Sequence, residues 1–145
     1  MILTENEYHK TLIRLEKDKE VIAQQKTNMT QLGLDEEQIE KAIQPSLCFY
    51  NQMTEEVEVY EKLRRGDIEP INNITHIGRL LIGSRIALNM SQNDLAEKLG
   101  VSPAVISRDE RNEYHGVTVE KAQRIFEALG VQITIKIDGP LPFAK

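Results

Sequence analysis

Hydrophobic residues in the first third of the chain follow a helical repeat. They recur every seven positions, at Tyr8, Leu15, Ile22 and Met29, while two of the three positions between them hold lysine. This is one half of a coiled-coil pattern. It predicts one helix from about Glu5 to Met29 that makes a short or one-sided contact.

A second long amphipathic stretch follows. Asp35 and Gln38 have the spacing of a capping box, and the stripe behind them advances in steps of three or four. Its members are Ile39, Ile43, Leu47, Tyr50, Met53, Val57, Tyr60 and Leu63. Pro45 lies inside this stretch and predicts a bend or a break near Gln44, because proline removes one helical hydrogen bond.

These two helices are expected to fold back on each other as a hairpin over residues 1–66. Two helices alone bury little apolar surface, so a further surface must cover them. A second copy or another protein is the first expectation, and the remainder of the same chain is the alternative. Residues 67–73 contain a proline and two asparagines and are the predicted linker.

The second half of the chain has shorter elements. Ser91 can cap one helix that ends before Gly100, and Ser102 can cap the next, with Pro103 at its first position. Ala96 allows close approach of the two backbones. The combination favours a helix-turn-helix over the alternative of an ordinary helical hairpin in an all-α core. The second helix leaves an outer face with room in a DNA major groove, formed by Pro103, Ala104, Ser107, Arg108 and Arg111.

A last helix is expected between Thr118 and Gly130. After it, apolar and polar residues alternate strictly, which predicts a β-strand over residues 131–137. A single strand leaves its edges unpaired, so this strand should pair antiparallel with a second copy of the chain. Its apolar face consists of Val131, Ile133, Ile135 and Ile137.

Residues from about Ile77 to Leu129 resemble the lambda-repressor-like Xre family of bacterial and phage DNA-binding proteins. The matching motifs are Gly78-Arg-Leu-Leu, Ser84-Arg-Ile-Ala, Ser91-Gln-x-x-Leu-Ala, Gly100-Val-Ser and Ile106-Ser-Arg-x-Glu. The resemblance implies that Gln92 and Ser102 touch phosphates or base edges, and that Ala104, Ser107 and Arg108 face the groove. Pro103-Ala104 departs from the polar residues common at this point of the family, so readout there would be apolar.

The same resemblance implies that Arg85 and Glu110 form a structural ion pair. In the loop after the second helix, Asn112, Tyr114 and His115 are further candidates for DNA contact, with packing as the alternative for His115. The ending of a helix followed by a strand resembles HipB-like antitoxins.

Composition limits the alternatives. The chain has 145 residues with 40% hydrophobic content, enough for one ordinary domain or two small ones. It contains no run of apolar residues long enough for a membrane span and no signal-peptide pattern, so a cytoplasmic protein is expected. Cys48 is the single cysteine, the three histidines are far apart, and no glycine-rich phosphate motif occurs. We therefore expect no enzymatic activity, no bound metal ion and no cofactor.

Charge differs between the two halves. Residues 1–72 hold nine Lys and Arg against fifteen Asp and Glu, whereas residues 73–130 hold seven of each kind. The acidic half should avoid DNA, and a neutral reader domain benefits from the doubled contacts of a dimer.

The sequence therefore predicts an all-α protein with a long-helix hairpin, a helix-turn-helix domain over residues 74–137 with one strand pairing between chains, and a flexible tail at 138–145. The expected function is a homodimeric transcriptional repressor that binds a palindromic operator in double-stranded DNA. The alternative is an antitoxin, whose acidic hairpin covers a basic toxin and whose DNA binding regulates its own operon.

Overall fold

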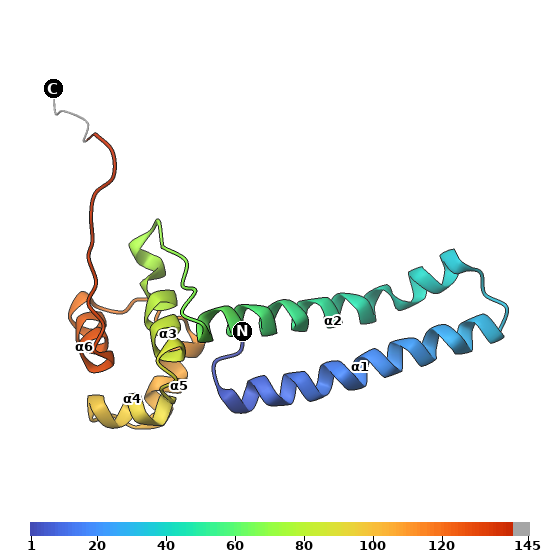
Figure 1. The fold of residues 1–145 in the computed structure, drawn as a ribbon, viewed down its shortest axis with the longest axis horizontal. Coiled ribbons are helices and arrows are strands. Elements are labelled where there is room, and N and C mark those ends of the chain that lie inside the picture. The colour runs from blue at the N-terminus through green and yellow to red at the C-terminus, as the bar shows by residue number, and fades with distance from the viewer. Residues whose placement is uncertain (141–145) are drawn as a thin grey trace.

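The computed structural model describes residues 1–140, in which all regular secondary structure is helical. The elements are α1 (Glu5–Gln31), α2 (Glu36–Arg64), the 3-10 helix η1 (Ile74–His76), α3 (Ile77–Ala87), α4 (Gln92–Leu99), α5 (Pro103–Arg111) and α6 (Val119–Leu129). Helices α1 and α2 form a long antiparallel hairpin that projects from a cluster of the four short helices (Figure 1). The predicted all-α class is confirmed for this part of the chain.

The hairpin is closed by the two predicted stripes. Leu15 and Ile22 of α1 and Ile43 and Val57 of α2 are buried between the helices. At the end nearest the short helices, Tyr60 is buried and stacks on Tyr8. The hydroxyl group of Tyr60 donates a hydrogen bond of 3.2 Å to the carboxylate of Glu5. Burial and the negative charge of Glu5 raise the pKa of Tyr60 to about 12.

Helix α2 is not broken at Pro45, while the bend expected near Gln44 stays a prediction. The capping box of Asp35 and Gln38 starts the helix as expected, but the helix then continues through Pro45 to Arg64. Pro45 is exposed, while Ile43 beside it is only 1% exposed and packs toward α1. Burial of the stripe on both sides of the proline outweighs one missing hydrogen bond.

One hydrophobic core joins the hairpin to the short helices. Ile2 and Leu3, which precede α1, are buried in the same cluster as Leu81 of α3 and Ile106 of α5. Of the two expectations for the hairpin, packing against the remainder of its own chain is therefore observed.

The predicted linker at residues 67–73 also takes part in packing. Ile68 is half-buried, and a Cβ atom at Gly83 of α3 would lie 3.4 Å from its side chain. This segment therefore lies against α3 along part of its length.

The C-terminal segment forms no strand in the single chain. Residues 131–138 have no regular secondary structure, and the segment runs away from the short helices (Figure 1). Val131 packs against the core, whereas Ile135 and Ile137 are 71% and 75% exposed. A helical domain offers this segment no strand edge, so its pairing remains a prediction about two chains. Of the predicted tail at 138–145, residues 141–145 lie outside the described part. None of the helices in residues 1–140 is long and apolar enough to cross a bilayer.

Candidate nucleic-acid interface

Helices α4 and α5 meet at the turn expected from the sequence. The hydroxyl oxygen of Ser91 accepts a hydrogen bond from the backbone N–H of Asp94, and the Asp94 carboxylate accepts one from the N–H of Ser91. Hydrogen bonds from Ser91 to this carboxylate hold the pKa of Asp94 below its usual value. Gly100 ends α4 with a φ of 67°, and Ala96, 1% exposed, faces the core. These features fix the angle at which α5 leaves the turn.

Helix α5 has one buried face and one open face. Ile106 and Glu110 are each 1% exposed. The opposite face carries Ala104, Arg108 and Arg111, all exposed, with Ser107 half-buried beside them. Within residues 1–140, neither Arg108 nor Arg111 takes part in an ion pair. Their guanidinium groups are therefore open to a ligand.

At the start of α5, Pro103 occupies the first turn and is exposed, as is Ser102 before it. The expected side-chain cap at Ser102 is not formed, because its hydroxyl group makes no capping hydrogen bond. That hydroxyl group lies on the exposed side of the turn.

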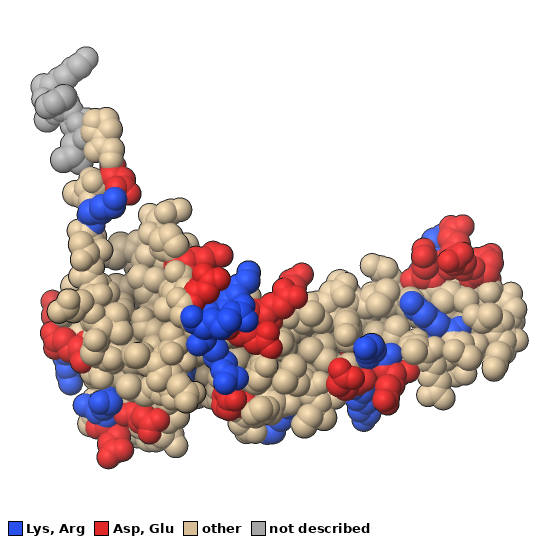
Figure 2. Space-filling model, in the orientation of Figure 1, with Lys and Arg blue, Asp and Glu red and all other residues tan. Residues whose placement is uncertain are grey.

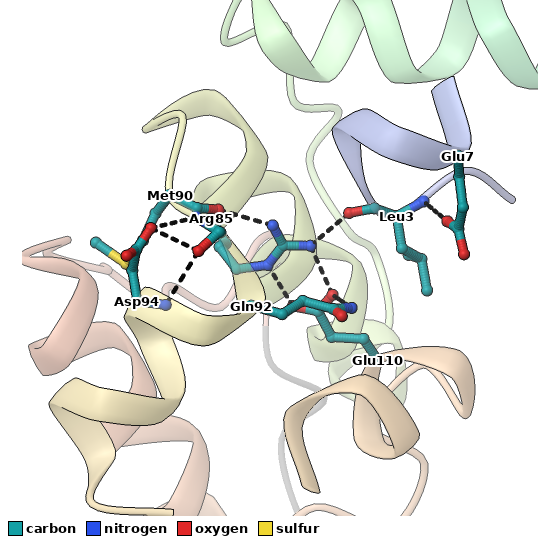
Figure 3. Close-up of polar contacts among 8 residues, drawn as sticks. Leu3, Glu7, Arg85, Met90, Gln92, Asp94 and Glu110 are labelled. Atoms are coloured by element: carbon teal, nitrogen blue, oxygen red, sulfur yellow. Dashed lines mark hydrogen bonds and ion pairs between the residues drawn. The ribbon is translucent and has the colours of Figure 1, made fainter. Parts of the chain in front are cut away.

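A buried ion pair holds α5 against α3. The Arg85 Nε donates to Glu110 Oε1 at 2.5 Å, and its Nη2 donates to Oε2 at 2.6 Å (Figure 3). The remaining Arg85 hydrogen bonds go to main-chain carbonyls, from Nη1 to Met90 and from Nη2 to Leu3, both at 2.8 Å. A two-point contact of this kind fixes the orientation of the guanidinium plane as well as its position.

Gln92 belongs to the same network. Its Nε2 donates to Glu110 Oε2 at 2.8 Å, which holds the side chain at the first residue of α4 (Figure 3). The contact through Leu3 was missed from the sequence, since a main-chain carbonyl 82 residues away from Arg85 leaves no side-chain pattern. The N–H of Leu3 is held in turn by the carboxylate of Glu7.

The loop after α5 corrects one candidate. Tyr114 is 4% exposed and packs in the core, so it does not present its side chain to DNA. Its hydroxyl group has no hydrogen-bond partner within residues 1–140, and burial raises its pKa. Asn112 and His115, by contrast, are exposed.

A polar cleft lies beside this loop and was not predicted. Its volume is about 450 Å³, and its walls come from the start of α3 and from the end of α5 with the loop that follows. The lining residues are Thr75, His76, Arg79, Arg111, Asn112, Glu113 and His115. Gly78 was the one available signal, because a glycine in the first turn of a helix indicates close approach by another segment.

The helix-turn-helix family model matches residues 84–136, just over a third of the chain. Residues 84–136 form a helix-turn-helix domain. The resemblance noted from the sequence is thereby confirmed for this domain, whereas the HipB-like character of its ending is not. No curated protein and no solved structure was found to match the chain.

The charge of the helix-turn-helix domain is mixed. Asp109 of α5 pairs with Lys121 of α6 at 2.6 Å, and the buried Arg85 is neutralised by Glu110. Acidic side chains gather over the far end of the hairpin, around the turn between α1 and α2 (Figure 2). Arg108 and Arg111 of α5 are the basic side chains on the open face of this domain, while the hairpin carries exposed lysines of its own, among them Lys10, Lys17 and Lys26.

Proposed function

We propose that this protein is a DNA-binding transcription regulator that places α5 in the major groove. The observation that carries the proposal is the open face of α5, where Arg108 and Arg111 are exposed and make no ion pair within residues 1–140 while Glu110 anchors the opposite face. The helix-turn-helix match over residues 84–136 supports it. A helix fixed in this way can be inserted into a groove without losing packing.

The residues of α4 and α5 and the turn between them have separate roles in the proposal. Arg108 reads guanine by two hydrogen bonds, and Pro103 and Ala104 offer apolar contact to a thymine methyl group. Gln92 and Ser102, at the two helix starts, contact phosphates in this proposal, which positions the protein but carries no sequence information.

The regulator acts as a homodimeric repressor in this proposal. Residues 131–137 expose an alternating apolar face, and pairing with a second copy would cover it. Two copies related by a two-fold axis would place their α5 helices about 34–36 Å apart on one face of a palindromic operator. A dimer also doubles the number of phosphate contacts, which compensates for the neutral charge of each domain.

An antitoxin role is the second candidate. The observation that favours it is the acidic far end of the hairpin (Figure 2), which suits a basic protein surface. Co-expression with the product of a neighbouring gene tests this role. The role would be supported if the protein restores growth and a variant with lysine at Glu36 and Glu37 does not.

The DNA-reading role is tested by selecting duplexes from a random pool and measuring affinity by fluorescence anisotropy. Arg108→Ala should reduce the discrimination between the selected and a scrambled duplex by about 1–3 kcal/mol, because one guanine contact is lost. Arg14→Ala on α1 removes the same charge far from α5 and is the control. An equal loss of affinity for both duplexes would show that Arg108 takes no part in base readout. The function would be rejected if the selection yields no preferred sequence.

A further inference from the structure

The cleft between the start of α3 and the loop after α5 has the chemistry of an anion site. We infer that it binds a phosphate of the DNA backbone, next to the base pairs that α5 reads. This inference rests on the proposed function and adds a contact from α3, outside the helices of the helix-turn-helix.

The charges that line the cleft favour an anion. Arg79 and Arg111 reach it from opposite walls, and His76 and His115 accompany them. His76 is the N-cap residue of α3 and lines the cleft, so the positive end of the α3 dipole lies at the same place. The hydroxyl group of Thr75 and the amide of Asn112 can donate hydrogen bonds as well.

The two walls are held at a fixed separation. Gly78 lets α3 touch the loop, since a Cβ atom there would lie only 1.9 Å from the carbonyl oxygen of Glu113. The loop is secured on its other side by the buried Tyr114, and both Glu113 and Tyr114 have left-handed backbones with φ near 50°. The cleft is therefore formed before any ligand arrives, which lowers the entropic cost of binding.

Its position matches a DNA backbone. Arg111 lies one helical turn beyond Arg108 and lines the cleft, so the cleft adjoins the open face of α5. A phosphate bound there would lie on a strand bordering the groove that α5 occupies.

Glu113 is the one acidic residue that lines the cleft. Its removal should therefore change DNA affinity in the direction opposite to removal of Arg79. Its carboxylate lies 3.9 Å from Arg79 Nε without a hydrogen bond, so the pair is loose and exposed. A phosphate would replace Glu113 as the partner of Arg79. Removing the negative charge should therefore strengthen DNA binding.

The experiment measures affinity for the selected duplex over a range of salt concentrations. Arg79→Gln should weaken binding about two- to fivefold on every duplex and lower the salt slope by about 1, while Arg79→Lys keeps the slope. Glu113→Gln should shift affinity in the opposite direction. Arg14→Gln on α1 controls for net charge, and melting temperatures identify any variant that is unfolded.

The outcomes separate this inference from the proposed function. An unchanged slope for Arg79→Gln, in a protein that still loses discrimination with Arg108→Ala, overturns the phosphate site and leaves the function intact. Titration with inorganic phosphate against chloride, followed by amide NMR shifts, gives a second measurement. Saturable shifts at Arg79 without any slope change would assign the cleft to a free anion and overturn the inference as well.

Discussion

Arg85 shows how much of the interface depends on one buried side chain. Its guanidinium group contacts Glu110 of α5, Met90 before α4 and Leu3 before α1. Since a buried charge is tolerated only with its partners in place, these segments are fixed relative to one another by the same group. Gln92 then receives its orientation from Glu110.

Glu110→Ala should lower the free energy of unfolding by about 3–5 kcal/mol, because it leaves the Arg85 charge buried without its counter-charge. Asp109→Ala, at the neighbouring position, removes a carboxylate whose Lys121 partner is partly exposed and should cost less than about 1 kcal/mol. Urea denaturation of both variants provides the comparison. Similar small losses would show that the Arg85 pair contributes little to stability.

Tyr114→Phe should raise the free energy of unfolding by about 1 kcal/mol and leave DNA affinity unchanged. The variant removes a buried hydroxyl group that has no hydrogen-bond partner within residues 1–140 and keeps the ring that fills the core. Thermal denaturation and anisotropy measure the two effects. A clear loss of stability would mean that the hydroxyl group is hydrogen-bonded in solution.

The sequence was informative about residues that recur in a pattern and uninformative about side-chain direction. The pairing of Arg85 with Glu110 followed from resemblance, and it is present in the structure. Tyr114, between polar neighbours in a loop, gave no sign that it turns inward. Its direction depends on the left-handed backbone at Glu113 and on the space beside Gly78, and both arise only in the folded chain.

At the scale of the elements, local chemistry predicted where helices begin and end. Asp35, Ser91 and Thr118 form the side-chain caps expected of them, and Gly130 ends α6 in a left-handed conformation. Ser102 makes no capping hydrogen bond, and Pro45 does not break α2, because the local preference for a break is opposed by a stripe that gains its stability from contact with α1. Contact between helices outweighs local propensity in such cases.

Gly78→Ala should lower the free energy of unfolding by about 1–3 kcal/mol, because its Cβ would overlap the Glu113 carbonyl and force the loop away from α3. Gly83→Ala, on the same helix, is the matched control. Its Cβ would lie 3.2 Å from the flexible side chain of Leu63, which can move, so the change should be close to neutral. Equal behaviour of the two variants in denaturant would show that the loop is not held by Gly78.

At the scale of the whole molecule, the sequence predicted two helical units but not how they join. An amphipathic stripe shows that a face is buried and gives no information about what covers it. In the structure Ile2 and Leu3 enter the core of the short helices, and α2 packs against α3. The hairpin and the helix-turn-helix domain therefore share one hydrophobic core.

The proposed homodimer requires a surface on which two copies meet. The hairpin already buries its stripe on its own chain, which leaves residues 131–137 as the expected contact between copies. Their exposed isoleucines alternate along a segment that has no regular secondary structure. Pairing of two such segments would form hydrogen bonds between their backbone N–H and C=O groups and cover their apolar faces.

Thr134→Pro should disrupt this contact, because proline removes one backbone donor from the middle of the ladder and distorts the strand. Analytical ultracentrifugation should show monomers at concentrations where the parent chain is dimeric, and affinity for a palindromic duplex should fall while affinity for a single half-site is kept. Thr134→Val keeps the donor and is the control. A dimeric Thr134→Pro variant with unchanged affinity for the palindrome would exclude the strand as the interface and direct attention to the exposed surface of the hairpin.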